Sequence, residues 1–499
     1  MSGSLVRRIR ALSDAGYGVN LFEVASPRAV EGVSTNVVGI VAHLPWGPTD
    51  EVTLITNAAE LWEVFYPNAL SASKDTAAWP ALLALQNQVL PAGGLRIVRV
   101  EATGAAAASS GGLTAGSGTV TLTAAHVGAI GNAIRYQWAA ASGGDSAKRD
   151  LLISVGTTYA ARYKDLGLAD LAAFSDPLVV LSAASPSAMP ATGAATALSG
   201  GADGTPVAGD FVGSSSATKG IRCFYAESAA VAVLFVAEAP AGLVDNVNTG
   251  LKAWADSVQR GMAALSAVPG QAADDAIAYV EDYRSDRLVY TWPRVRTVNF
   301  LDPANPEVTV DGNAWAAFAI ANVEPWLSPG GAGGAPFLRG ITSLANSAAT
   351  ATTLDLLNEA GVAPWFMSSA FEGCILRLGC TTARSGRTRI FDRRMTDFLL
   401  ESIARHAERF TESQLDVDLA GRDLGPNSDA LITAVLGFLS GLKEANRIAD
   451  FQLDPFGGNT TGDLAAGRWT LVLRVRLYSM AEVIVLRAQV GTTVSITAE

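Results

Sequence analysis

Hydrophobic positions near the start of the chain form first a strand-like run and then a helix-like stripe. The run is continuous, as is typical of a buried strand, and consists of Val37, Val38, Ile40 and Val41. Residues 57–67 carry apolar residues at helical spacing, between a cap at Asn57 and a stop at Pro67. Residues 95–102 form a second strand-like run. This strand–helix–strand order predicts the beginning of an α/β core.

The pattern changes after residue 102. Residues 103–118 are rich in Ala, Ser and Gly, a composition typical of a linker. The segments TVTLTA, NAIRYQWAA and DLLISVGTTY then alternate polar and apolar residues, which predicts a small β-rich insert. Residues 181–206 are again biased in composition and end in ALSGGADGT at 197–205. The three glycines of this segment are spaced wrongly for a phosphate-binding loop, so we interpret it as a structural turn at the boundary.

Helical spacing returns in the next part of the chain. Residues 230–240 predict a buried strand, residues 271–286 a helix and residues 287–300 a further strand. Between the first two lies a helical stripe formed by Leu251, Trp254, Ala255, Val258, Met262 and Leu265. This order predicts the second half of an α/β core with a parallel component.

The last part of the chain combines helices and strands. Residues 391–410 and 427–446 each show an apolar face at helical spacing and predict two helices. Residues 468–480 alternate, with Leu473 and Val475 on one side and two arginines on the other, and residues 481–490 predict another strand. The tail at 491–499 also alternates, so it needs a sheet edge to pair with, in this subunit or another.

These patterns predict an α+β or α/β multidomain protein. We expect an α/β middle domain interrupted by a β-rich insert, and a C-terminal α+β domain. The boundaries are 1–24 for an N-terminal arm, 25–102 and 206–336 for the two parts of the α/β core, 103–205 for the insert, 337–484 for the C-terminal domain and 485–499 for a C-terminal arm.

Composition excludes some classes of protein. The 499 residues include 49% hydrophobic and 17% charged residues and carry a net charge of −11, which indicates a globular chain without the basic stripe of a nucleic-acid binder. The arginine-rich segment at 384–394 is therefore interpreted as a solvated face or a protein contact. Cys374 and Cys380 lie about 20 Å apart along a predicted strand, too far for a local disulfide. The odd count of three cysteines is typical of synthesis in the cytoplasm.

Targeting segments are not predicted. The first 16 residues lack the apolar centre of a signal peptide. The longest apolar run, at 229–237, is far shorter than the roughly 20 residues of a membrane helix. We therefore expect no membrane insertion.

No segment concentrates catalytic or metal-binding chemistry. In GSSSATKG (213–220) a glycine follows Lys219 where a phosphate loop needs Ser or Thr. DVDLAG (416–421) resembles the start of a calcium-binding loop but has Ala420 at a position that should carry a ligand. The histidines, His43, His126 and His406, lack metal-ligand spacing. A Ser–His–Asp triad stays open, although no G-x-S-x-G segment occurs. We predict no catalytic, cofactor-binding or metal residue, and no enzyme.

Several segments, taken in order, resemble the sheath proteins of contractile phage tails and related injection machines. They cover most of the chain: EGVSTNVVGIVAHLPWGPTDEVTLITNAAELWEVF (31–65), VGAIGNAIRY (127–136), ALSGGADG (197–204), NEAGVAPWF (358–366), RIFDRRMTDFLLESI (389–403) and GGNTTGDLAAGRWTLVLRVRLYSMAEVIVLRAQV (457–490). Each motif is weak alone, and the colinear set is specific. The chain departs from the family at Met480, where Pro is common before Ala481–Glu482, and at 324–341.

The resemblance implies a helical homo-oligomer around an inner tail tube. The terminal arms would exchange strands with neighbouring copies, through Val19, Leu21, Val490, Val494 and Ile496. The tube-proximal C-terminal domain would contact the tube protein through Arg393, Arg394, Arg405 and Arg409. Further partners would be baseplate and tail terminator proteins, with no direct nucleic-acid contact and no cofactor. The location implied is the virion tail, and the host cytoplasm during assembly.

The resemblance also implies a mechanism. An extended, high-energy lattice would relax to a shorter and wider one and drive the tube through the host envelope. The glycine-rich joints at 103–118 and 197–205 are candidate compliant connectors, and the extended arms are better hinge candidates. Two alternatives are an α/β hydrolase with a β-rich insert and another virion structural protein, of the baseplate or capsid.

Overall fold

The computed structural model describes residues 8–9, 21–22, 36–65, 90–156, 159–226, 230–299, 304–331, 333–334, 336, 338–346, 350–410 and 426–480. Two compact units divide the chain. One comprises Ser34–Met395, and the other comprises Met1–Val33 together with Thr396–Glu499. The boundary between them falls within helix α8 (Ile390–Ala407).

The larger unit is built on a six-stranded sheet in the order β15-β14-β13-β3-β5-β4. All neighbouring strands are parallel except β4 and β5. The strands are β3 (Val38–Ala42), β4 (Thr53–Ile55), β5 (Leu95–Arg99), β13 (Val233–Ala237), β14 (Met262–Ala264) and β15 (Leu288–Val289). Every residue of β3 and β13 is buried, because helices cover both faces of a parallel sheet.

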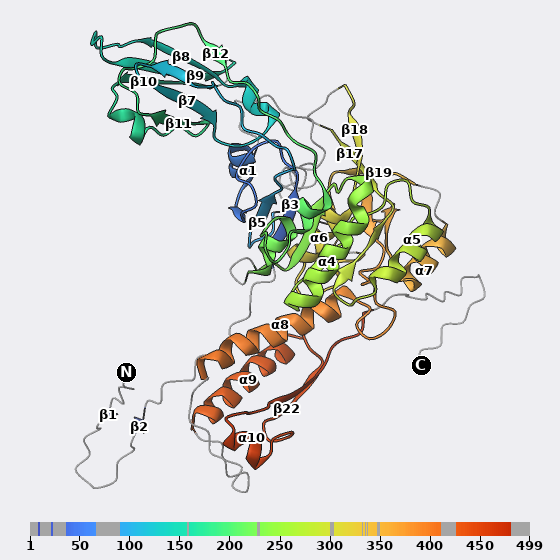
Figure 1. Cartoon of the computed structure of the whole chain (residues 1–499). Helices are drawn as coiled ribbons and strands as arrows, with labels where there is room; N and C mark the ends of the chain where they lie inside the picture. Colours follow the sequence, from blue (N-terminus) through green and yellow to red (C-terminus); the bar gives the residue numbers. More distant parts are fainter. Residues whose placement is uncertain are drawn as a thin grey trace, which may run out of the picture. The chain divides into compact units, whose positions relative to one another are not determined.

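Two helices cover opposite faces of this sheet. Helix α6 (Asn313–Asn322) packs in one apolar cluster with Ile40 and Phe235, and α4 (Val244–Val258) packs in the other with Leu234. Figure 1 labels α4 and α6 in this unit. The shorter helices of the unit are α1 (Ala58–Phe65), α3 (Ala208–Val212), α5 (Ala273–Val280) and α7 (Ala351–Glu359).

Two further small sheets extend the core. One has the order β16-β20-β21, formed by β16 (Thr291–Trp292), β20 (Ala363–Ser368) and β21 (Gly373–Leu376). The other has the order β18-β17-β19, formed by β17 (Val295–Val298), β18 (Glu307–Val310) and β19 (Ile341–Leu344).

The insert is a two-sheet β structure around its own apolar cluster (Figure 1, blue-green strands). One sheet has the order β10-β9-β8-β12 and the other β11-β7-β6. Its strands are β6 (Leu113–Ala115), β7 (Gly118–Ala124), β8 (Arg135–Ala140), β9 (Arg149–Val155), β10 (Tyr159–Leu166), β11 (Val179–Ala184) and β12 (Thr196–Ala197). The three segments whose alternation predicted strands, TVTLTA, NAIRYQWAA and DLLISVGTTY, contain most residues of β7, β8 and β9.

The smaller unit pairs helices with a hairpin. It contains the C-terminal part of α8, α9 (Pro426–Glu444), β22 (Asp450–Asp454), α10 (Thr461–Ala465) and β23 (Val472–Arg476). Phe398 on α8 and Phe438 on α9 stack with ring centroids 6.0 Å apart. The strands β1 (Arg8–Ile9) and β2 (Leu21–Phe22) pair with each other antiparallel. Among the described residues, no helix has the length and apolar character needed to cross a membrane.

The capping residues predicted from the sequence are the ones that cap helix α1. Helix α1 ends at Phe65, and the Asn57 side chain caps it by accepting a hydrogen bond from the Glu60 amide at 2.9 Å. The Glu60 carboxylate in turn accepts a hydrogen bond from the Thr56 amide at 2.7 Å. The predicted helix at 57–67 is therefore confirmed, while Pro67 lies outside the described residues.

Two predictions about secondary structure were wrong. The helical stripe from Leu251 to Leu265 is broken, because α4 ends at Val258 and Gln259 adopts a left-handed conformation with φ of 53°. Residues Met262–Ala264 instead form β14, a central strand. The linker prediction for 103–118 also fails, because Ala108 is fully buried and Leu113–Ala115 form β6. Small residues there allow two chain segments to approach closely.

Candidate assembly surfaces

The hairpin of β22 and β23 has one apolar and one polar face. Phe451 lies opposite Val475 and Leu453 opposite Leu473, and all four side chains are half-buried. The alternate positions are exposed and consist of Asp450, Gln452, Asp454, Arg474 and Arg476. Alternation of this kind is typical of a sheet with one covered face. Within the described part of the chain, β22 and β23 pair only with each other, so both outer edges of the hairpin lack a partner strand.

Contacts with α9 and within the connecting loop hold the hairpin in place. Lys443 Nζ on α9 lies 2.8 Å from Asp450 Oδ1, and this hydrogen bond is the largest cause of the lowered pKa of Asp450. Asp454 Oδ1 accepts hydrogen bonds from the amides of Phe456 and Gly457 at 3.0 and 2.8 Å. A two-stranded sheet is marginally stable alone, and its open edges are ready to accept further strands.

Sequence reasoning identified β23 but missed β22. The prediction for 468–480 is confirmed in its alternation, since Arg474 and Arg476 are exposed and Leu473 and Val475 are half-buried. The signal for β22 was the same alternation in DFQLD at 450–454, directly after helix α9. Five residues with two aspartates have low strand propensity, which hides such a segment.

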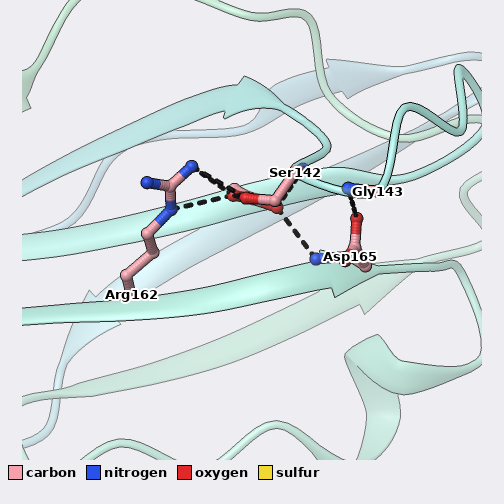
Figure 2. Close-up of polar contacts among 5 residues, drawn as sticks. Ser142, Gly143, Arg162 and Asp165 are labelled. Atoms are coloured by element: carbon pink, nitrogen blue, oxygen red, sulfur yellow. Dashed lines mark hydrogen bonds and ion pairs between the residues drawn. The ribbon is translucent and has the colours of Figure 1, made fainter.

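The insert carries a polar cluster around a buried carboxylate, that of Asp150, at one end of its larger sheet. Asp150 accepts hydrogen bonds from the Ser142 amide and hydroxyl, from the Asp165 amide at 2.9 Å and from the Arg162 guanidinium. Asp165 in turn accepts one from the Gly143 amide at 2.7 Å (Figure 2). These bonds fix the loop between β8 and β9 against β10. All of them are internal, so the cluster is structural.

A pocket of about 390 Å³ lies at the carboxyl ends of β14 and β15, where α/β enzymes hold their ligands. It is lined by residues 267–271, residues 292–294, Thr309, Ala345 and Asn346. No serine, cysteine or histidine is among these described residues. Gln271 is already engaged, because its Oε1 accepts a hydrogen bond from the Tyr290 hydroxyl at 2.5 Å. The pocket therefore offers no nucleophile–base pair for the hydrolase alternative.

The three histidines lie on separate segments of the structure. His43 follows β3, and His126 packs edge-on against Trp46 with ring centroids 5.1 Å apart. His406 on α8 is buried, and its ring lies against that of Phe410 with centroids 5.5 Å apart. No group of three His, Cys, Asp or Glu suited to a metal ion occurs among the described residues. Cys223, Cys374 and Cys380 are buried free thiols.

Comparison with known proteins adds the decisive observation. The sheath tail protein of Desulfitobacterium hafniense has a TM-score of 0.61 at 15% identity, over 88% of this chain and 93% of its own. The sheath tail protein of Listeria innocua gives 0.60 at 13% identity, over 90% and 96%. The helical sheath of the anti-feeding prophage in its contracted state gives 0.55 at 14% identity, over 96% and 99%. The chain has the tail sheath fold.

This finding confirms the resemblance in the sequence at the level of the fold. No protein-family model and no curated protein matches the sequence. The fold was therefore recognisable only from motifs in order and from the structure. The mixed α+β multidomain class is likewise confirmed.

Only part of the sheath fold's expected arms falls on described residues. Leu21 lies in β2, where it pairs with Ile9 of the same chain. Val19, Val490, Val494 and Ile496 lie outside the described residues. The calcium-loop imitation at 416–421 and the predicted strand at 481–490 lie outside them as well.

The four arginines proposed for the tube divide into two pairs. Arg393 is 7% and Arg394 is 4% exposed. Arg393 Nη1 lies 3.1 Å from Asp286 Oδ2, and Arg394 Nη1 donates to the Glu324 carbonyl at 3.3 Å. Burial lowers the pKa of Arg394 to about 10. Arg405 and Arg409 are exposed. The sequence therefore misplaced Arg393 and Arg394 on the surface, because helical spacing does not reveal which polar residues neighbouring loops cover.

Other arginines of the segment 384–394 also bind acids of the same chain. Arg384 forms an ion pair with Glu281, and Arg387 Nη1 lies 3.7 Å from Asp286 Oδ2. The segment thus ties the start of α8 to the turn after α5. These ion pairs are contacts within the chain.

Proposed function

We propose that this chain is a structural subunit of a contractile sheath, in a phage tail or a related injection machine. The observation that carries the proposal is the β22–β23 hairpin, whose two outer edges have no partner strand among the described residues, in a chain with the tail sheath fold. Open edges on a short two-stranded sheet need strands from elsewhere. The neighbouring copies of this chain are their source.

The terminal arms supply the added strands. Residues 1–24 and 485–499 pair with the hairpin edges of adjacent copies, with Val19, Leu21, Val490, Val494 and Ile496 as the apolar positions. Each arm strand gains a few hydrogen bonds of about 1 kcal/mol net apiece. A head-to-tail contact of this kind does not close on itself, so it builds a helical polymer.

Contraction requires no nucleotide. The sheath assembles in an extended lattice held by a baseplate and relaxes to a shorter lattice with larger contacts between subunits. The arms are the hinges about which subunits rotate. The free energy of the new contacts drives the inner tube through the cell envelope.

The partners follow from this arrangement. Arg405 and Arg409, exposed on α8 and the turn after it, are the candidate contacts to the tube protein. Baseplate and terminator proteins bound the two ends of the sheath. The subunit is made in the host cytoplasm and works in the virion tail or its equivalent.

Electron microscopy of the purified chain tests the proposal. Full-length protein is expected to form tubes, and removal of residues 485–499 is expected to leave soluble monomers. Long tubes from the truncated chain would exclude strand exchange by this arm. Discrete rings or shells from the full chain would instead favour a baseplate or capsid component.

Point substitutions sharpen the test of the arm. Alternation places Val494 and Ile496 on one face of a strand and Thr493 and Ser495 on the other. The double variant Val494→Asp/Ile496→Asp should abolish tubes, because it places charge against the apolar face of the receiving sheet. Thr493→Asp/Ser495→Asp is the matched control and should still assemble.

A further inference from the structure

The insert joins the core through two chain segments that pair with each other. Isolated antiparallel bridges link Thr103 to Thr205, Ala106 to Ala202 and Ser109 to Ser199. Asn132 reinforces this ribbon, because its side chain both donates to the Gly201 carbonyl and accepts from the Gly201 amide, each at 2.9 Å. The joint is therefore a hydrogen-bonded element rather than the compliant connector suggested by its composition.

Arg99, at the end of β5, binds both sides of this joint. Its Nε donates to the Leu44 carbonyl and its Nη1 to the Gly47 carbonyl, each at 2.7 Å, and both acceptors follow β3 in the core. Its Nη2 donates to the Val127 carbonyl at 2.7 Å, in the insert. Arg99 is only 2% exposed. A buried guanidinium with three carbonyl acceptors holds three backbone segments in one geometry.

A histidine lies directly beside this bond. His126 precedes Val127 and packs edge-on against Trp46, which is a member of the insert's apolar cluster although it comes from the core sequence. Burial, and then the positive charge of Arg99, lower the pKa of His126 to about 4. The imidazole is neutral at pH 7. Protonation would place a second cation beside Arg99.

The acids of the joint bind amides and a hydroxyl. Asp203, from the returning segment, accepts a hydrogen bond from the Ala129 amide at 2.7 Å. Asp210, from α3, accepts hydrogen bonds from the Thr103 amide at 3.0 Å and from its hydroxyl. The charged side chains that bond across the joint, within the part of the chain that the structure describes, are thus Arg99 from β5, Asp203 from the insert's last segment and Asp210 from α3. Among the described residues, Arg99 is the charge that lowers the pKa of His126.

We propose that Arg99 and His126 form an acid-sensitive joint, which locks the insert to the α/β core while His126 is neutral and releases it when His126 is protonated. Arg99 acts as a positioning residue in this joint. When the imidazole is neutral, it packs against Trp46, and Arg99 keeps its hydrogen bonds to the three carbonyl groups. An imidazolium repels that guanidinium and requires hydration, so acid opens the contact between Val127 and the core.

Amide hydrogen exchange on the full chain tests the lock at pH 7. Arg99→Met should speed exchange in residues 103–109 and 199–205 by on the order of tenfold, since local opening becomes easier. Arg96→Met is the matched control, because Arg96 lies on the same strand and donates to the Ala230 carbonyl in the core. Equal exchange in the two variants would overturn the proposal. Arg99→Lys keeps the charge, and it should show the same local effect if Arg99→Met does not fold.

A second comparison tests the acid sensitivity. At pH 4.5 wild-type exchange in the same two segments should exceed that of His126→Phe several-fold, because phenylalanine keeps the packing on Trp46 and cannot be protonated. At pH 7 the two proteins should match. His43→Phe is the control and should follow the wild type at both pH values. Wild-type exchange equal to that of His126→Phe at pH 4.5 would refute the acid switch while leaving the Arg99 lock to its own test. Neither measurement depends on sheath assembly.

Discussion

Asp150 and Arg162 form an ion pair across neighbouring strands of the insert, with Arg162 Nη2 2.6 Å from Asp150 Oδ2. The carboxylate is fully buried while the arginine is half exposed, so the pair anchors a surface side chain to an interior charge. Ser142 and the amide of Asp165 complete the shell of donors around that charge (Figure 2). The loop between β8 and β9 depends on this one side chain.

Replacement of Asp150 should therefore destabilise the insert. The Ser142 hydroxyl, the Asp165 amide and Arg162 hold the pKa of Asp150 well below its usual value of 3.8. The carboxylate thus stabilises the fold above about pH 4, and this contribution is lost as the pH falls further. Asp150→Asn should lower the thermal midpoint at pH 7 and flatten its acid dependence. Asp170→Asn is the control and should change little, because Asp170 accepts a hydrogen bond from the Gly167 amide that an asparagine oxygen can also accept.

Substitution of the buried Arg393 should lower the free energy of unfolding more than substitution of the exposed Arg405. Arg393→Met should cost about 2 kcal/mol, because it leaves Asp286 without its buried partner. Arg405→Met should cost about 0.5 kcal/mol or less, since its i,i+4 pair with Glu401 is exposed. Urea midpoints of the two variants measure the difference. Equal costs would contradict the assignment of Arg393 to an internal role.

A methyl group at Gly201 should disturb the joint of the insert. A Cβ there would lie 2.5 Å from the Gly128 carbonyl oxygen and 3.1 Å from Asn132 Oδ1. Gly201→Ala should therefore cost about 1–3 kcal/mol through overpacking. Gly193→Ala is the control, because nothing lies within 4 Å of its Cβ position, and it should stay within about 0.5 kcal/mol. Thermal unfolding of both variants measures these costs. An unchanged thermal midpoint for Gly201→Ala would show that the paired segments are not tightly packed at Gly201.

The buried acid Asp311 should give the core a second pH dependence. Asp311 is 1% exposed, and burial raises its pKa to about 7 even though Arg294 lies nearby and the Ala267 amide donates to it at 2.7 Å. The folded state then binds a proton that the unfolded state releases near pH 4, so stability falls as the pH rises from 4 through 7. Asp311→Asn should remove this slope. Urea midpoints at pH 5 and pH 8 measure it, and parallel slopes for both proteins would contradict the raised pKa.

Local elements could be predicted where the signal lay within one turn or one strand. Asn57 and Glu60 defined the start of α1 without help from distant residues. The apolar run of residues 230–240 identified β13, and alternation identified β23. These features depend on backbone periodicity and on caps that reach at most four residues along the chain.

The sequence predicted the candidate assembly surfaces only in part, because the rest depends on contacts between residues far apart in the chain. Strand β22, the partner of β23, is short and acidic, and only its pairing gives it a structure. Met262–Ala264 continue the apolar stripe of α4, yet they form a strand because β13 and β15 lie on either side. Arg393 is internal because Asp286, 107 residues away, lies beside it.

The order and type of most local elements, the strands of the β-rich segment and the resemblance to sheath proteins could be predicted from residue spacing, because each depends on neighbours along the chain. Only the folded structure reveals that the Ala- and Gly-rich segments pair closely and that Arg99 bonds to both the core and the insert. It also shows that, among the described residues, no strand pairs with the outer edges of the β22–β23 hairpin. Contacts between distant residues set the burial of each charge and the partner of each strand. No pattern in one segment contains that information.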